Sequence, residues 1–313
     1  MDRRAVLKSL ACLGAWPALS GAASFDLPPI PGTHGCVAAA HRVGIISVGG
    51  PGRQMLGAVH GSIAGGALLI EAHRTLLDDA LTGLDLAIIV AGLGDVAGSS
   101  LPSEIAAVTR ARGIPTYAVA LLPTAFSERI GGEVATTGLA HLREKTIATF
   151  TMPLGRAAAG PFCFWRVHAS VAPPEKAFRQ LLHSLAMPLS GSTALGVNIK
   201  DFEEVLSGNG EAATGFGYAR GKDAAARATQ RAIDHPLLGE RRLRTSGGIL
   251  ILVATSNPSI SLRCATQVWS VIRDAIPEFF EGLVVFDFMA RPESATEEFQ
   301  VTILAGGVTP EPV

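Results

Sequence analysis

A turn with three closely spaced glycines is the first candidate for chemistry in this chain. Gly92, Gly94 and Gly98 follow an apolar run and precede a stretch with helical periodicity. The run, 86–90, shows no polar alternation, which is typical of a strand buried on both faces of a parallel sheet. Glycines at the end of such a strand let backbone N–H groups approach a ligand, and the following helix directs its positive dipole end there. The pattern predicts a phosphate-binding turn.

The sequence around this turn predicts the elements that position it. In order, it indicates a strand at 43–48, a helix at 70–81, a strand at 86–90, a helix and strand up to Pro123, a helix at 138–144 and a strand at 146–152. Strands that alternate with helices over short connections are typical of a doubly wound, mostly parallel sheet. We therefore expect an α/β, Rossmann-like first domain.

The second half of the chain has a different pattern. A helix at 174–187 is long enough to connect two domains, and the charged run 240–244 is interpreted as a solvated turn. Strands are expected at 212–218, 248–254, 282–289 and 299–305, and helices at 223–234 and 261–275. Four strands with two helices on one face form a compact α+β unit of ordinary domain size.

Composition excludes several classes of function. The 313 residues carry a net charge of -1, which leaves no basic surface of the kind that nucleic acid requires. The body of the chain contains no uncharged apolar span long enough for a bilayer-spanning helix. The four cysteines lack CxxC spacing and the eight histidines lack an HxxxH pair. We therefore expect no metal site, no disulfide framework and no nucleic-acid partner.

The N-terminal segment, 1–26, has the pattern of an export signal. Arg3 and Arg4 precede an apolar stretch at 10–19, and small residues follow at 21–24. A charged region, an apolar region and a cleavage site occur in this order in secretory signals, and the paired arginines are typical of the twin-arginine type. If the signal acts, the protein is exported to the periplasm; otherwise it is cytoplasmic.

The second half also carries a family likeness. The segments SGNG (207–210) and TGFG (214–217) resemble a glycine-rich strand that is shared by the members of one protein family. The helix end AIDHPLL (232–238) and the turn NPSISL (257–262) match further markers in the same order and spacing. On these residues the chain resembles FtsZ, the bacterial member of the tubulin superfamily, along nearly all of 43–307. The resemblance implies a GTPase-type domain, a central helix and an activation-type domain.

The first half resembles the family in outline. VGGPG (48–52) lies where the family has a run of glycines, and AGLG (91–94) begins the segment that corresponds to the tubulin signature. The acidic residue at the start of the central helix would retain a contact to guanine. By this resemblance, GTP with Mg2+ would be bound by Gly49, Gly50, Gly52, Arg53, Gly92, Gly94, Gly98, Ser99, Glu128 and Glu175.

Several departures from the family affect this expected site. The signature continues as Asp95-Val96-Ala97-Gly98, one residue short and without three of the glycines. Asp95 would place a carboxylate where phosphates need N–H donors, and like charge there weakens binding. Arg53 replaces a glycine and would either pair with phosphate or fill the space, and Leu154 stands where an asparagine would face the base. These changes predict a weak or degenerate GTPase.

Asn198 and Asp201 form a second candidate site. The family places two aspartates three residues apart in the loop that completes the site of the neighbouring subunit, where they polarise the attacking water. The same spacing here gives Asn198 and Asp201. An asparagine can position a water but cannot take its proton, so half of the acid pair remains. The alternative is that Asp201 caps the helix at 202–206.

These observations together predict a GTPase-type domain at 27–173, a central helix and catalytic-type loop at 174–206, and an α+β domain with a four-stranded sheet at 207–313. The function implied by the resemblance is GTP binding, weak GTP hydrolysis and head-to-tail self-association in a cell-division or cytoskeletal role. Because the chain stops shortly after its last expected strand, we expect no family-type C-terminal peptide for membrane anchors.

Two alternatives from other classes remain open at this point. The first is an assembly or regulatory paralogue that keeps the fold but has lost GTP binding. The second is an unrelated dinucleotide enzyme, for which the only support is the G-x-G-x-x-x-G spacing from Gly92 to Gly98. That spacing departs from the dinucleotide fingerprint, and an acid that would bind the ribose is not evident after it.

Overall fold

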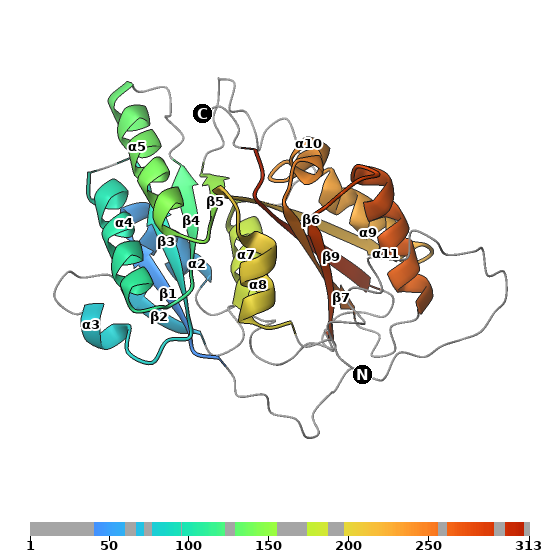
Figure 1. The fold of residues 1–313 in the computed structure, drawn as a ribbon, viewed down its shortest axis with the longest axis horizontal. Coiled ribbons are helices and arrows are strands. Elements are labelled where there is room, and N and C mark those ends of the chain that lie inside the picture. The colour runs from blue at the N-terminus through green and yellow to red at the C-terminus, as the bar shows by residue number, and fades with distance from the viewer. Residues whose placement is uncertain are drawn as a thin grey trace.

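One large sheet runs through the molecule (Figure 1). The computed structural model describes residues 41–59, 67–71, 77–94, 96–122, 129–154, 174–186, 197–255, 262–290 and 298–309. Within these ranges nine strands pair in the order β2-β1-β3-β4-β5-β6-β9-β7-β8. The strands are β1 (Val43–Val48), β2 (Leu68–Glu71), β3 (Leu86–Gly92), β4 (Thr116–Leu122), β5 (Ala148–Pro153), β6 (Gly210–Arg220), β7 (Gly248–Thr255), β8 (Leu283–Ala290) and β9 (Glu298–Gly306).

Helices cover both faces of this sheet. In chain order they are α2 (Gly49–Val59), α3 (Leu77–Ala80), α4 (Val96–Ala111), α5 (Arg129–Lys145), α7 (Pro174–Ala186), α8 (Ile199–Leu206), α9 (Ala224–Ile233), α10 (Gly239–Arg244) and α11 (Leu262–Ala275). The helix expected at 174–187 is confirmed as α7. None of the helices in the described ranges combines the length and the apolar character needed to cross a membrane.

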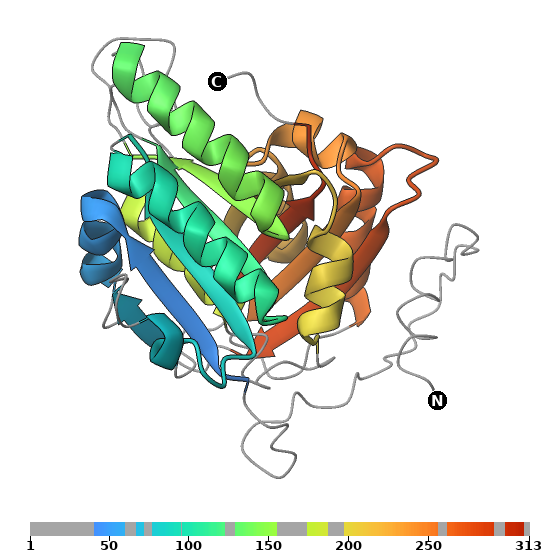
Figure 2. The same ribbon diagram turned by 60° about the vertical axis from the view of Figure 1, so that its left-hand side comes forward.

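The first five strands are parallel, and their core strands are buried on both faces. Every residue of β1 and β3 is buried, because alternate side chains enter two different cores. Helix α2 packs Met55 and Leu56 into one core, and α4 packs Ile105 and Ala106 into the core on the opposite face. Figure 2 shows α4 and α5, in teal and green, side by side across that second face. The predicted doubly wound, mostly parallel α/β sheet is confirmed.

The second half of the sheet is mixed. Strand β9 pairs antiparallel with both β6 and β7, and β8 pairs parallel with β7. One face is covered by α9 and α11, whose Ala228 and Ile272 enter a common core with Ile251 and Ile303 of the strands. The other face is covered by α8. The four strands and two helices expected in this half are confirmed, and α10 is an additional helix.

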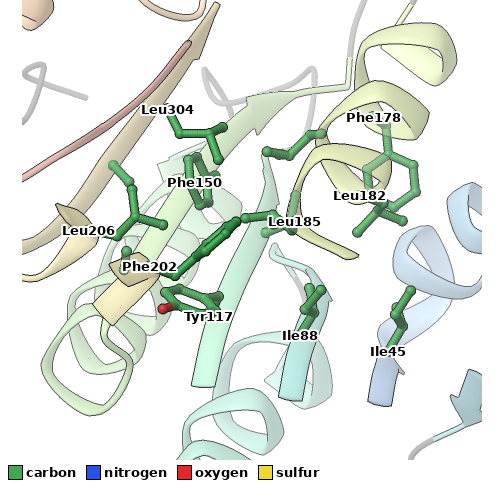
Figure 3. Close-up of a cluster of buried hydrophobic side chains, with 14 of the residues drawn as sticks. Ile45, Ile88, Tyr117, Phe150, Phe178, Leu182, Leu185, Phe202, Leu206 and Leu304 are labelled. Atoms are coloured by element: carbon green, nitrogen blue, oxygen red, sulfur yellow. The ribbon is translucent and has the colours of Figure 1, made fainter. Parts of the chain in front are cut away.

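A single hydrophobic core connects the two halves (Figure 3). Tyr117 of β4 and Phe150 of β5 meet Phe202 and Leu206 of α8, together with Leu304 of β9. The rings of Tyr117 and Phe202 contact edge to face, with centroids 6.4 Å apart. Burying each such side chain contributes about 1.5–3 kcal/mol, so the halves are held together by apolar packing as well as by strand pairing.

The helix expected at 70–81 is wrong over its first part. Ile70 and Glu71 end strand β2, which pairs in parallel with β1, and Leu77–Ala80 are helical as expected. Residues 72–76 lie outside the described ranges. The spacing of the leucines after Arg74 is helical, but the apolar run at 68–70 pairs with the open edge of β1 instead.

Candidate functional site

The carboxyl ends of β1 and β3 form the first candidate site. These strands are neighbours, yet α2 follows β1 toward β2 on one side, and α4 follows β3 toward β4 on the other. Neighbouring strands whose connections diverge leave a crevice at their carboxyl ends, which is the usual ligand position in open α/β sheets. The amino ends of α2 and α4 lie at this position, so their N–H groups and positive dipole ends are directed to it.

Two glycine turns interlock at this crevice. Gly49 has a φ of 77°, and a Cβ added there would lie 3.2 Å from the carbonyl oxygen of Gly92 and 3.4 Å from Cα of Gly98. A Cβ on Gly92 would lie 2.7 Å from Cβ of Pro51. Backbone therefore packs on backbone, as glycine alone allows. The structure brings together five predicted positions, Gly49, Gly50, Gly52, Gly92 and Gly98.

Ser99 closes the second turn. The N–H of Gly94 donates a hydrogen bond to Oγ of Ser99 at 3.4 Å. Ser99 is buried, and its Cβ lies where a side chain on Gly138 of α5 would clash. The hydroxyl of Ser99 thus accepts a hydrogen bond from the N–H of Gly94, which the sequence analysis had predicted to bind phosphate. Asp95 lies outside the described residues, and the role of Gly94 and Ser99 in binding stays a prediction.

Arg53 lies beside the first turn and is paired. Its Nη1 donates to Oε1 of Glu71 at 3.0 Å, and Glu71 ends β2 next to Ser47 of β1. Both side chains are about half exposed, at 52% and 53%. An exposed pair of this kind contributes about 0–1 kcal/mol. The guanidinium is therefore held next to the crevice by a contact that is easily exchanged for another anion.

Asn198 and Asp201 form a capping box at the start of α8. Oδ1 of Asn198 accepts hydrogen bonds from the N–H groups of Lys200 and Asp201, at 2.9 and 3.3 Å. In return, Oδ2 of Asp201 accepts from the N–H of Asn198 at 2.9 Å. These bonds satisfy donors that a helix start leaves unpaired. The alternative that Asp201 caps the helix is corrected: Asn198 is the cap and Asp201 is its capping-box partner, while a role in hydrolysis stays a prediction.

A buried acid ties the residue before this cap to the sheet. The N–H of Val197 donates to Oδ2 of Asp287 at 3.0 Å, and Oδ1 of Asp287 accepts from the N–H of Phe288 at 2.7 Å. Asp287 lies on β8 and is 0% exposed. Sequence reasoning missed this residue. The available signal was a single acid inside the otherwise apolar run 283–289.

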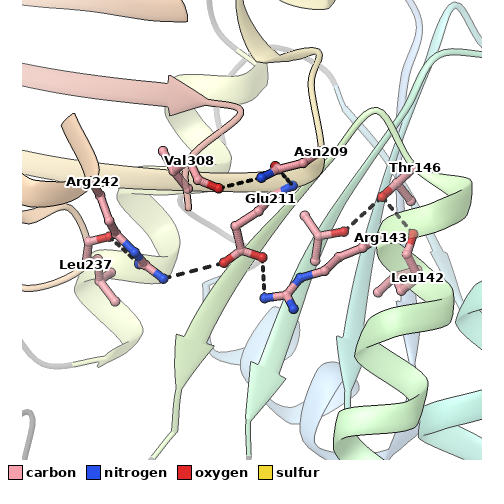
Figure 4. Close-up of polar contacts among 9 residues, drawn as sticks. Leu142, Arg143, Thr146, Asn209, Glu211, Leu237, Arg242 and Val308 are labelled. Carbon is pink, nitrogen blue, oxygen red and sulfur yellow. Dashed lines mark hydrogen bonds and ion pairs between the residues drawn. The ribbon is translucent and has the colours of Figure 1, made fainter. Parts of the chain in front are cut away.

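A second cluster that sequence reasoning missed lies where β5 meets β6. The wholly buried carboxylate of Glu211 pairs with Arg143 at the end of α5 and, at 3.5 Å, with Arg242 of α10 (Figure 4). Burial raises the pKa of Glu211 above its ordinary value, and the two guanidinium groups act in the opposite direction. The solvated turn predicted at 240–244 is wrong, because these residues form α10 and bury Arg242 against Glu211.

The remaining predicted residues lie apart from these clusters or outside the described ranges. Glu175 is exposed on the first turn of α7, a helix that contacts α2. The N–H of Leu154 donates to the carbonyl oxygen of Leu122 at 2.9 Å, directly after β5. Glu128 and the segment 1–26 lie outside the described residues. Across the ranges that the structure covers, no group of three or more His, Cys, Asp or Glu side chains is placed to hold a metal ion.

Comparison with known proteins points to one family. Residues 210–309 match the model described as the FtsZ family, C-terminal domain. The chain is 28% identical over 242 residues to the cell division protein FtsZ of Azotobacter vinelandii, and 29% identical over 244 residues to that of Pseudomonas aeruginosa. Each match covers 75% of this chain and 59% of the relative, so the chain spans less than two thirds of the length of these relatives.

Solved structures share the fold at lower identity. An empty FtsZ dimer from M. jannaschii gives a TM-score of 0.65 at 16% identity, covering 85% of this chain and 88% of that one. A GTPγS-bound protofilament of CetZ2 from Haloferax volcanii gives 0.64 at 15% identity, covering 86% and 93%. This chain is therefore similar to FtsZ over most of its length, matches the FtsZ C-terminal domain at 210–309, and shares the fold of these solved structures.

Proposed function

We propose that this chain binds GTP at the crevice between β1 and β3, hydrolyses it weakly and associates head to tail in a cytoskeletal or cell-division assembly. The observation that carries the proposal is the position of two helix amino ends, α2 and α4, over the interlocked turns at Gly49 and Gly92. Backbone N–H groups at helix starts favour phosphate. Relatives named as a cell division protein and as a protofilament support the assembly role.

The two turns and their surroundings supply groups suited to a nucleotide. The phosphates would lie against the turns formed by Gly49, Gly50, Gly52, Gly92, Gly94, Gly98 and Ser99. Mg2+ would enter with the phosphates, whose oxygens supply ligands for it. Arg53 would exchange its exposed pair with Glu71 for a phosphate oxygen, to which a guanidinium can donate two parallel hydrogen bonds. Glu175, exposed at the start of α7, would accept from the N–H groups of guanine.

Hydrolysis would require the α8 loop of a second copy. Asp201 would polarise the attacking water and Asn198 would help to orient it. Capping and water positioning are compatible, because a carboxylate has several lone-pair positions and the capping box uses one oxygen of Asp201. With one carboxylate in place of two, proton removal is the weakened step, so turnover is expected to be slow.

An assembly protein without GTP binding is the second candidate. Two observations favour it: the N–H of Gly94 donates to Ser99, and Arg53 is paired with Glu71. Both contacts employ groups that a phosphate would need. The dinucleotide enzyme is not favoured, since the matches over 210–309 and over most of the chain are to FtsZ and its relatives.

Equilibrium binding of labelled GTP to the purified full chain separates the two candidates. We expect saturable binding that GDP displaces and ATP does not, together with assembly detected by sedimentation. No binding at millimolar GTP, with assembly retained, would establish the second candidate. The variant Asp201→Asn keeps an oxygen for the N–H of Asn198 but removes the carboxylate, so it should bind GTP and assemble yet lose turnover. Unchanged turnover in this variant would contradict the catalytic role of Asp201.

A further inference from the structure

Asp287 joins β8, at the edge of the sheet, to the loop that precedes α8. Its carboxylate is 0% exposed, and its Oδ2 accepts from the N–H of Val197, which lies 90 positions earlier in the chain. The capping residue Asn198 follows Val197 directly. The side chain of Asp287 on β8 therefore fixes the backbone at Val197, directly before the capping box.

The sheet side of this contact is rigid. Strand β8 pairs with β7 over its whole length, from Leu283 opposite Gly248 to Ala290 opposite Thr255. Asp287 also accepts the N–H of its neighbour Phe288, which fixes the second carboxylate oxygen. Burying a carboxylate is unfavourable unless hydrogen bonds compensate it. A fixed strand that holds a buried acid against the N–H of Val197 indicates that the strand positions the start of α8.

We infer that Asp287 is a positioning residue for the α8 loop: it holds Val197 so that Asn198 and Asp201 are presented to the next copy of the chain in one orientation. Asp287 is wholly buried, so its effect on the site passes through Val197. The functional part of this inference rests on the proposed GTPase, in which the same loop completes the neighbour's site. The positional part does not, since it concerns the free subunit.

Two variants and a matched control separate positioning from general stability. Asp287→Ala removes both acceptors. Asp287→Asn keeps a single acceptor oxygen for two N–H donors, so it should have an intermediate effect. The control is Thr302→Val on β9, which removes a buried contact with Ser184 of α7 at 3.3 Å and does not touch the loop.

Hydrogen exchange in the unassembled full chain measures the positional part. In Asp287→Ala we expect the amides of 197–201 to lose about 10- to 100-fold of their protection, as follows from the loss of one buried hydrogen bond. The amides of β7 and β9 should keep theirs, and Thr302→Val should leave 197–201 unchanged. Unchanged exchange at 197–201, or an equal loss across β7 and β9, would overturn the inference.

Steady-state kinetics measure the functional part. Asp287→Ala should lower kcat for GTP about tenfold, with the Kd for GTP unchanged, because the nucleotide binds in the other half of the subunit. Mixing it with Gly52→Val, whose added Cβ would lie 2.8 Å from the carbonyl oxygen of Val90 and displace the first turn from β3, should restore activity at interfaces that combine one unaltered loop with one unaltered turn. A rise in Kd, or no recovery on mixing, would contradict the role. If the unmodified chain binds no GTP, the proposed function is wrong, but the hydrogen-exchange result still shows whether Asp287 holds Val197 in place.

Discussion

Glycine brings backbones together in both halves of this molecule, but for different purposes. In the first half, Gly49 and Gly92 interlock two turns at the edge of a crevice. In the second, Gly215 and Gly217 of β6 lie under α9, where an added Cβ would meet the carbonyl oxygen of Ala232 at 2.0 Å and that of Ala228 at 1.7 Å. The second pair serves packing alone, and no side chain fits there.

This difference explains where the family likeness is strongest. The domain match spans 210–309, the half in which glycines are fixed by close packing of a helix on a strand. The departures gather at the turns of the first half, where Ser99 and Arg53 contact groups next to the crevice. Packing constraints keep the fold recognisable, whereas a ligand site can change without loss of the fold.

The largest effect should come from the junction between the halves. Glu211→Ala would remove the carboxylate that pairs with the partly buried Arg143 and the buried Arg242, and removing one partner from a buried ion pair costs about 3–5 kcal/mol. Urea unfolding followed by circular dichroism measures this loss. The triple variant Arg143→Leu, Glu211→Leu, Arg242→Leu should recover most of it, because apolar side chains can replace a buried ionic cluster. A single variant as stable as the unmodified chain would show that the junction is held by packing alone.

A glycine pair tests the comparison directly. Gly217→Ala should lower the free energy of unfolding by about 1–3 kcal/mol, because its Cβ would overlap the backbone of α9. Gly50→Ala, with no atom within 4 Å of the added Cβ, is the matched control and should leave the stability nearly unchanged. Thermal unfolding of both variants gives the answer, and equal losses would remove the distinction between the two kinds of glycine.

The α8 cap offers a gain of function. Asn198→Asp keeps a good capping side chain and restores a second carboxylate, so GTP turnover should rise about tenfold with little change in stability. Asn198→Ser also caps the helix but adds no carboxylate, and its turnover should stay at the original level. Phosphate release under assembly conditions measures both. A rise in the serine variant as well would attribute the effect to the loop rather than to the acid.

The smallest effect is expected at the exposed pair beside the first turn. Arg53→Ala should weaken GTP binding several-fold, while Glu71→Gln, which releases the guanidinium, should strengthen it by a similar factor, since exposed pairs are worth about 0–1 kcal/mol. Competition binding with labelled GTP resolves such shifts. Changes of the same sign in both variants would show that the pair stabilises the turn instead of competing with phosphate.

The sequence predicted the fold well because the local pattern of apolar residues identifies most of the helices and strands. Apolar runs such as 43–48 and 248–254 became buried strands, since period and length identified them without reference to partners. The error at 70–81 arose because pairing with another strand determined the structure of residues 68–71. Strand β2 forms there because β1 has an open edge. Helix α10 was missed for a similar reason, because the burial of Arg242 depends on Glu211, more than thirty positions away in the chain.

The candidate site was predicted in part. The pattern of an apolar run, glycines and a helix identified the turn at Gly92, whereas the first glycine turn and the pair Asn198 and Asp201 were identified through the resemblance to FtsZ. Neither the pattern nor the resemblance identified the hydroxyl of Ser99 as an acceptor for Gly94, or Asp287 as the anchor of Val197, because both are contacts fixed by the folded backbone. The acid within the apolar run 283–289 was the signal for Asp287, whereas Glu211 directly follows the glycine-rich segment 207–210 and carried no such signal.

The order of strands in the second half has a consequence for synthesis. Strand β9, the last of the described strands to be made, lies between β6 and β7. Until residues 298–306 have left the ribosome, the edges of β6 and β7 that pair with β9 are unpaired, although α9 and α11 have already been synthesised. Open edges of this kind pair with any matching strand. Two nascent chains on one message could therefore exchange their β9 strands, and prompt capture of the chain's own β9 closes that route.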